Sequence, residues 1–306
     1  MQTVRKHHLV AVGLAGALLF GTAACGSSGG SDSSGATTTA ASGSTKDAKI
    51  AAMVPSKLTD AGKIVVAADA SYAPNEFFDT DNKTVIGMDA DLAKALGDVM
   101  GLKVEVTNAG FDTIIPALGH RYDIGMSSFT DNLERQKTVD FVDYFSAGTS
   151  FYVPAGKNAD LTTLDSLCGH TVGVEKGTTQ QDDATAQSKT CTSAGKDAVT
   201  VTSFPDQSGA NTALASGRVD VVMADSPVAA YAVKQSNGKF DLGAKEYGDA
   251  PYGIALPKSS EYAGLDKAIQ ASLQKLDADG TYDEIMEKWG VEAGEVKEFP
   301  INGATS

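Results

Sequence analysis

Apolar and polar positions alternate along the chain in a pattern that predicts strands and helices in turn. Three apolar runs predict strands, and two stretches with apolar residues at helical spacing lie between them. The runs are 63–70 (KIVVAADA), 102–109 (LKVEVTNA) and 122–129 (YDIGMSSF), and the helical stretches are 88–101 and 111–120. Because strand and helix alternate at this spacing, we predict parallel strands in a doubly wound α/β sheet.

The same order of elements returns in the second half of the chain. The hexapeptides RYDIGM (121–126) and RVDVVM (218–223) align without gaps, each at a predicted strand. The other predicted strands and helices of this half lie within 161–186, 198–204, 209–235, 251–260, 261–280 and 281–290. We therefore predict two similar α/β lobes that face each other.

Polar side chains follow the predicted strands at their carboxyl ends, where open α/β sheets bind ligands. Ser127, Ser128 and Thr130 follow one strand, and Arg135 comes five residues later; Asp225 follows the matching strand of the second half. Hydroxyl groups beside an arginine indicate an anion site, since a guanidinium can bind a carboxylate bidentately. The alternative is a solvated helix arginine, with Ser128 and Thr130 in turns and Asp225 as a helix N-cap.

The chain begins like an exported protein. A basic start (MQTVRKHH) precedes the apolar run 9–20, which is too short to span a bilayer, so we assign 1–24 to a signal peptide. Cys25 resembles the lipidated cysteine of a bacterial lipoprotein, and ordinary cleavage near Ala24 is the alternative. A Ser/Gly-rich tract follows that can bury no core, and we assign 25–58 to a lipid anchor and tether. We expect an extracytoplasmic protein anchored to the outer face of the cell membrane.

Composition narrows the possible partners. The 306 residues are 42% hydrophobic, enough for a sizeable core, and the net charge is −14, or −16 once Arg5 and Lys6 leave with the signal peptide. Such a charge argues against nucleic acid and against electrostatic docking on anionic lipid. Contact with the membrane then depends on the lipid. We expect no cofactor and no metal.

Two further cysteines, Cys168 and Cys191, remain in the exported part of the chain. In that compartment such a pair usually forms a disulfide, which we predict here. The alternative is a metal site that uses Cys168 and His170.

Several separated motifs together resemble the family 3 extracellular solute-binding proteins, the amino-acid receptors of ABC importers. They are VVAADASYAPNEFF, GMDADLAKAL, FDTIIPAL, MSSFTDNLERQKTVDF, VGVEKGTTQ, GRVDVVMAD and DADGTYDEIMEKWG, in order between about 63 and 290. The resemblance implies the two-lobed clamp of type II periplasmic binding proteins, each lobe a doubly wound α/β sheet. Lobe 1 would comprise 59–147 and 252–298, and lobe 2 would comprise 148–251, with hinge crossings near 148–153 and 247–252.

The resemblance also implies roles for individual residues. Arg135 would bind the α-carboxylate of an amino acid, and Asp225 would accept from its α-ammonium. Ser127, Ser128, Thr130 and Thr179 would add polar contacts. Tyr72 and Phe111 would flank the ligand side chain, although from the sequence alone both also fit core positions. Asp69 lies where family members that bind basic ligands place a carboxylate, and glutamine-type members can carry an acid there too. We therefore expect a polar or basic L-amino acid.

The expected partners are therefore an L-amino acid, an ABC permease and, through the permease, an ATPase subunit, with the protein itself a monomer. Two other functions use the same fold. A dehydratase-type enzyme would need a catalytic carboxylate, but the exported part has only two histidines, His120 and His170, and no nucleophile or metalloprotease motif. A sensory receptor domain would need a following membrane helix or kinase. We expect a binding protein and no enzyme.

Overall fold

The computed structural model describes residues 45–243 and 246–304. By its internal contacts the chain divides into 1–40 and 41–306, and the second unit contains all the elements that follow. The predicted signal peptide and Cys25 lie outside the described residues. Within these residues, none of the helices has the length and apolarity that a membrane span needs.

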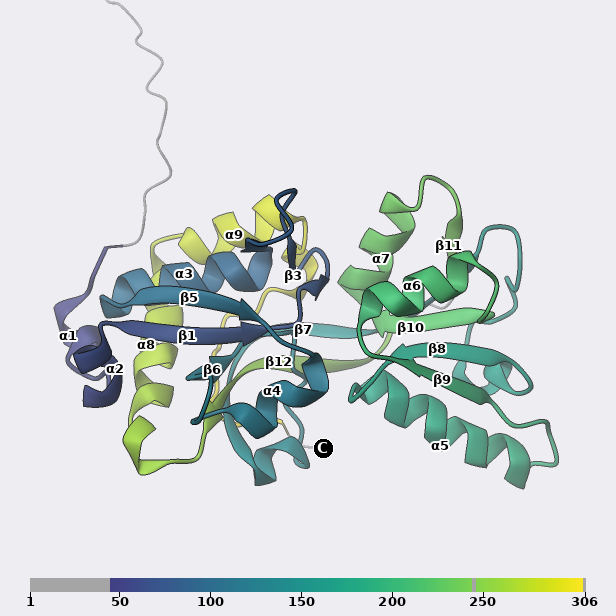
Figure 1. Cartoon of the computed structure of the whole chain (residues 1–306), viewed down its shortest axis with the longest axis horizontal. Coiled ribbons are helices and arrows are strands. Elements are labelled where there is room, and N and C mark those ends of the chain that lie inside the picture. The colour runs from purple at the N-terminus through teal and green to yellow at the C-terminus, as the bar shows by residue number, and fades with distance from the viewer. Residues whose placement is uncertain (1–44, 244–245, 305–306) are drawn as a thin grey trace, which may run out of the picture. The chain divides into compact units, whose positions relative to one another are not determined.

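At one end of the sheet, parallel strands carry helices on both faces (Figure 1). Strand β1 (Lys63–Ala68) pairs with β5 (Lys103–Asn108) and β6 (Ile124–Gly125), and helices α3 (Met88–Met100) and α4 (Phe111–Ala117) connect the strands. Alternate residues of β1 enter different cores. Ile64 and Val66 pack with α3, whereas Ala67 packs with α4. This end of the sheet therefore has a core on each face.

The other end of the sheet repeats this arrangement. Strand β8 (Thr171–Glu175) pairs with β9 (Thr200–Phe204) and β10 (Val221–Asp225), all parallel. Along β10, Val221 and Met223 pack with α5 (Thr179–Ser193), while Val222 and Ala224 pack with α6 (Gln207–Ala215) and α7 (Ser226–Gln235). Figure 1 shows α5 on one side of these strands and α6 and α7 on the other. The mixed α/β class predicted from the sequence is confirmed.

Two long antiparallel strands join the two ends. Strand β7 (Val139–Pro154) pairs with β12 (Tyr247–Pro257) along most of its length and with β10 near its end. The path β5-β1-β6-β12-β7-β10-β8-β9 is therefore continuous, and β11 (Phe240–Leu242) pairs with β7 beside it. The sequence analysis placed chain crossings near 148–153 and 247–252 but did not predict that 139–154 is one strand. Irregular register in β12 lies between Tyr247 and Gly253.

Shorter elements and the last helices complete the fold. A small sheet of β2 (Ser71–Tyr72), β3 (Glu76–Phe78) and β4 (Val85–Ile86) follows β1. The other elements are α1 (Ala48–Ala51), α2 (Ser56–Ala61), α8 (Leu265–Ala278), α9 (Thr281–Trp289) and the 3₁₀ turns η1 (Arg135–Lys137), η2 (Leu164–Leu167), η3 (Ser260–Tyr262) and η4 (Glu292–Gly294). Helices α8 and α9 share one core with α3, so the end of the chain completes the first end of the sheet.

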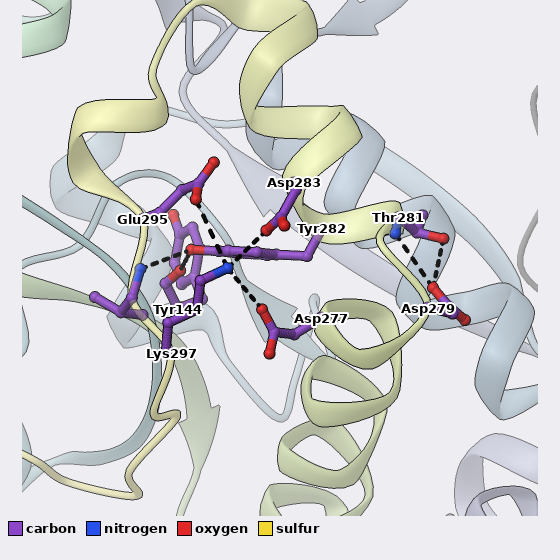
Figure 2. A network of polar contacts seen from close by, with 9 residues as sticks. Tyr144, Asp277, Asp279, Thr281, Tyr282, Asp283, Glu295 and Lys297 are labelled. Atoms are coloured by element: carbon purple, nitrogen blue, oxygen red, sulfur yellow. Dashed lines mark hydrogen bonds and ion pairs between the residues drawn. The ribbon is translucent and has the colours of Figure 1, made fainter.

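A polar network fastens the last segment to α8, α9 and β7 (Figure 2). Lys297 Nζ lies 2.9 Å from an Asp277 oxygen and 2.8 Å from an Asp283 oxygen. The buried Tyr282 hydroxyl donates to the Tyr144 carbonyl at 2.8 Å and accepts from the Val296 N–H at 3.1 Å. Exposed ion pairs contribute little to stability, so we assign most of the attachment to the buried tyrosine.

The folded part starts earlier than the sequence predicted. Ile50, Val54 and Leu58 are buried in the core with α3 and α8, although 25–58 was assigned to the anchor and tether. Asp47 caps α1 by accepting from the N–H groups of Lys49 and Ile50. The start of the folded part was not evident from the sequence, because the polar tract 26–45 precedes it and only a few apolar residues mark the first short helices.

A disulfide joins Cys168 to Cys191, as predicted. It links the segment before β8 to the last turn of α5, so it fixes the far end of a helix whose first turn faces the cavity described below. Because Cys168 is bonded to Cys191, the alternative metal site with His170 is excluded.

Replacing Cys168 and Cys191 together with serine should lower the free energy of unfolding by roughly 3 kcal/mol, because the open loop regains conformational entropy. Urea unfolding of both proteins measures the difference. Reduction of the parent protein by a thiol should give the same loss. A difference well below about 1 kcal/mol would show that the bridge contributes little to stability.

Candidate functional site

A small cavity lies where the carboxyl ends of four strands meet the first turns of α4 and α5. All nine site residues predicted from the sequence line it. They are Asp69, Tyr72, Phe111, Ser127, Ser128, Thr130, Arg135, Thr179 and Asp225, and the cavity adds Glu175, Thr178 and Gln180. The strand-end rule places most of these side chains, since Asp69, Ser127, Glu175 and Asp225 end or follow β1, β6, β8 and β10.

Arg135 enters the cavity from η1. Its Nη1 donates to the Thr130 carbonyl at 2.9 Å and its Nη2 to the Gly177 carbonyl at 3.1 Å. The guanidinium carbon lies 5.4 Å from the centre of the Phe111 ring and 5.6 Å from that of Phe129. Among the described residues it forms no ion pair within 4.0 Å. Burial lowers the pKa of Arg135. The guanidinium is thus positioned by neutral groups, which leaves its charge available to an anion.

Asp225 lies in the N-cap position of α7, but its side chain does not cap that helix. Instead it accepts from Gln180 Nε2 and from the Tyr252 hydroxyl, both at 2.7 Å. Burial raises the pKa of Asp225 to about 6, and these two hydrogen bonds and the charge of Arg135 oppose the rise. The two hydrogen bonds therefore fix the orientation of the Asp225 carboxyl. Because the group is buried, a ligand cation is a better partner for its charged form than water is.

Two more carboxyl groups face the cavity. Asp69 Oδ2 accepts from the Phe111 N–H at 3.0 Å. Glu175 is 2% exposed, and its Oε1 has no hydrogen-bond partner. Burial raises the pKa of Asp69. Burial, and next the charge of Asp69, raise the pKa of Glu175 well above its usual value. The sequence analysis missed Glu175, although it is the last residue of the predicted strand TVGVE and the strand-end rule applies to it.

The serines at the end of β6 have partners inside the protein. Ser127 Oγ donates to Glu76 Oε1 at 3.0 Å, and Ser128 Oγ donates to Glu76 Oε2 at 3.3 Å. Ser128 has a φ of 52°, a left-handed conformation that is uncommon for a residue with a side chain. The sequence analysis expected both hydroxyls to serve the cavity and did not single out Glu76.

The threonines and aromatic residues form the remaining wall. Thr178 caps α5 by accepting from the Gln181 N–H, so Thr179 begins the helix at the cavity. Phe111 stacks on Phe129 with ring centres 4.6 Å apart. Tyr72 is buried in the core with α6 and α7, and it also lines the cavity. Tyr72 and Phe111 are therefore both core residues and cavity-lining residues.

Contacts across the cavity connect the two ends of the sheet. Besides the bond from Arg135 to the Gly177 carbonyl, the Asp225 N–H donates to the Tyr72 hydroxyl at 3.0 Å. At the rim, Lys176 Nζ lies 2.7 Å from an Asp112 oxygen. These contacts span the cavity, and its charged groups come from both ends of the sheet.

Residues 64–292 match the model of the bacterial extracellular solute-binding proteins, family 3. The chain belongs to this family. It is 36% identical to the arginine-binding protein ArgT of Corynebacterium glutamicum over 83% of each chain. It is 34% identical to the glutamine-binding protein GlnH of Bacillus subtilis, over 66% of this chain and 72% of the relative. A solved structure of an ancestral arginine-binding protein bound to arginine is 38% identical, with a TM-score of 0.67 over 74% of this chain and 98% of the other.

These likenesses confirm the predicted family and an extracellular solute-binding role. The family and these relatives are binding proteins, so the prediction of a binding protein rather than an enzyme is also confirmed.

The contribution of Asp225 to the stability of the ligand-free solute-binding protein should fall as the pH rises from about 4 to about 6. Asp225 keeps its proton in the folded state up to about pH 6, whereas in the unfolded chain it ionises near its ordinary pKa of 3.8, so the folded state binds more protons in this window. Asp225→Asn should remove up to about 3 kcal/mol of this fall in unfolding free energy. Urea unfolding at the two ends of the window checks this. Asp60→Asn on the exposed surface of α2 is the control, and equal pH dependence in all three proteins would contradict the assignment.

Proposed function

We propose that the protein is the amino-acid-binding component of an ABC importer and that its ligand is L-arginine. The observation that carries the proposal is the charge facing the cavity: one guanidinium, Arg135, against the three carboxyls of Asp69, Glu175 and Asp225. Arginine has the complementary set, one carboxylate and two cations. In this arrangement its α-carboxylate binds Arg135, and its α-ammonium binds Asp225.

The side chain of the ligand then meets Asp69 and Glu175. A planar guanidinium can donate to two carboxylates at once, which a lysine ammonium does less well. The environment of Glu175 supports this role, because the buried Glu175 side chain contacts Asp69 and no cation, and such a pair is costly to ionise unless a ligand supplies one. Tyr72 and Phe111 would flank the apolar part of the side chain. Ser127, Ser128, Thr130 and Thr179 would complete the polar wall near the α-carbon.

Glutamine is the competing ligand, since one relative is named as a glutamine-binding protein. The amide of glutamine carries no charge, so it would leave both Asp69 and Glu175 without a cation. Desolvated carboxylates without a cation are unfavourable. The arginine-binding relatives support the same choice.

Binding would close a clamp. We assign 148–251 to lobe 2 and 59–147 with 252–298 to lobe 1, which also includes the core residues Ile50, Val54 and Leu58. Strands β7 and β12 would form the hinge near 148–153 and 247–252. Arg135 and Asp69 come from lobe 1, and Asp225 and Glu175 come from lobe 2. A ligand that binds all four residues favours the closed state by its contacts with both lobes.

In the cell, the protein would act as a monomer on the outer face of the membrane. The lipid on Cys25 would anchor it, and the Ser/Gly-rich tether would let it reach an ABC permease that works with an ATPase subunit. Nucleic acid plays no part in this proposal, and no metal or cofactor is required.

Replacing Arg135 with alanine should weaken arginine binding by roughly 2–5 kcal/mol, or about thirtyfold to several thousandfold, because the ligand carboxylate loses its partner. The arginine affinity of Arg135→Lys should lie between those of the parent and Arg135→Ala, since lysine keeps the charge but not the bidentate geometry. Isothermal titration calorimetry measures both. A loss below about fivefold for Arg135→Ala, with the fold intact, would make the carboxylate assignment wrong.

Glu175→Gln should weaken arginine binding by about ten- to a hundredfold, since it removes a charge-assisted hydrogen bond of about 1.5–3 kcal/mol, and it should change glutamine binding much less. Asp69→Asn should act in the same direction. The matched control is Asp112→Asn, which alters a carboxylate at the rim that already pairs with Lys176. Competition binding experiments with arginine and glutamine measure both affinities in each variant. If Glu175→Gln weakens both ligands equally, Glu175 does not select the side chain.

Cys25→Ala should release the protein from cells into the medium, because the lipid would be its only membrane attachment. Fractionation of cells that produce each form measures this. Membrane association that persists in the variant would refute the anchor.

A further inference from the structure

Two buried carboxyl groups, those of Glu76 and Asp89, lie directly behind the serines that end β6. Glu76 comes from β3 and is 0% exposed; Asp89 comes from the first turn of α3 and is 1% exposed. The two side chains are within hydrogen-bonding contact of each other. Neither lines the cavity, and neither was singled out from the sequence.

The donors around this pair are divided unequally. Asp89 accepts from the Tyr144 hydroxyl at 2.6 Å and from the Ser128 N–H at 3.0 Å. Glu76 accepts only the hydroxyls of Ser127 and Ser128. The other titratable groups that face the pair are Asp69 and Tyr144, and in the described part of the chain no lysine or arginine balances its charge.

Two adjacent buried carboxyls without a cation cannot both ionise at moderate cost, so one proton stays on the pair. Asp89 has the stronger hydrogen-bond donors, so we assign it as the ionised member. Glu76 therefore carries the proton and donates a hydrogen bond to Asp89. Burial, and next the charge of Asp89, raise the pKa of Glu76 well above its usual value. Burial also raises the pKa of Asp89 to about 6, against its hydrogen bonds.

The pair supports the part of the chain that presents the cavity residues. Asp89 holds the N–H of Ser128, the residue with a φ of 52°. Glu76 orients the hydroxyl of Ser127, which accepts from the Asp69 N–H at 2.8 Å. A left-handed residue with a side chain is strained, and it persists only where its surroundings impose that conformation. Thr130 and Arg135 leave this turn toward the cavity.

We propose that Glu76 and Asp89 are positioning residues that share one proton, and that this shared proton holds the strand-end turn in the geometry that binds the ligand. Only the ligand-binding part of the proposal rests on the proposed function. Tyr144 anchors the pair to β7, and the Tyr282 hydroxyl binds the Tyr144 carbonyl from behind (Figure 2).

The test compares Glu76→Gln with Glu76→Met in the purified full-length chain. Glutamine imitates the protonated acid, because its amide can donate to Asp89 while its carbonyl accepts from Ser127. It should keep arginine affinity within about threefold of the parent at pH 7, whereas methionine should lose more than about tenfold. A Glu76→Gln variant that loses as much affinity as Glu76→Met would show that Glu76 works as an anion and would overturn the proposal. Full affinity in Glu76→Met would also overturn it.

A second measurement needs no ligand and separates this proposal from the identity of the ligand. The unfolded chain ionises Glu76 above its usual pKa while the folded chain keeps the proton, so this residue costs the parent stability as pH rises. The Tm of Glu76→Gln should therefore rise by several degrees relative to the parent between about pH 5 and about pH 8. A constant difference in Tm would show that Glu76 holds no proton. If the parent binds no arginine at all, the proposed function fails, and this measurement still decides the shared proton.

Asp143→Asn is the matched control. Asp143 is also buried, and burial with the neighbouring Asp131 raises its pKa to about 8, but it contacts neither serine and lies outside the cavity. This variant should shift the pH dependence of stability and leave arginine affinity unchanged. An equal loss of affinity in Asp143→Asn would assign the effect of Glu76→Met to general destabilisation and contradict the positioning role.

Discussion

The fold encloses ionisable side chains in one cavity, and this burial of charge limits which ligands the protein can bind. Leaving an ion desolvated and unpaired costs several kcal/mol, so the protein must neutralise such groups or supply a partner for them. Burial raises the pKa values of Asp69, Glu175 and Asp225, so these groups keep their protons to a higher pH than they would in water. Arg135 is held by backbone carbonyls and aromatic rings. A ligand with one anionic and two cationic groups would allow all four side chains to ionise together.

The sheet explains how one ligand can act on both ends of the protein. Strands β1 and β6 deliver Asp69 and the serine turn from one side, and β8 and β10 deliver Glu175 and Asp225 from the other. Strands β7 and β12 connect the two ends, so relative movement would bend these strands and leave the cores intact. Direct contacts also join the two ends, such as the hydrogen bond from the Asp225 N–H to the Tyr72 hydroxyl.

Much of this could be predicted from the sequence, because strand and helix periodicity is local and strand ends gather at one edge of a sheet. That rule, with the family resemblance, pointed to nine residues that line one cavity. It did not reveal Glu76 or Asp89, since an acid in EFF or MDAD gives no sign of burial until tertiary contacts enclose it. The long strand β7 was missed because its mixture of aromatic, acidic and small residues lacks a clear period. Ile50 and Leu58 were assigned to the tether because so few apolar residues flank them.

A crystal structure of the protein in complex with L-arginine would show whether these side chains bind the ligand. We expect the ligand carboxylate on the guanidinium of Arg135, its ammonium against Asp225 and its side-chain guanidinium between Asp69 and Glu175. A complex with arginine bound outside this cavity, or with its side chain directed away from both Asp69 and Glu175, would contradict the account.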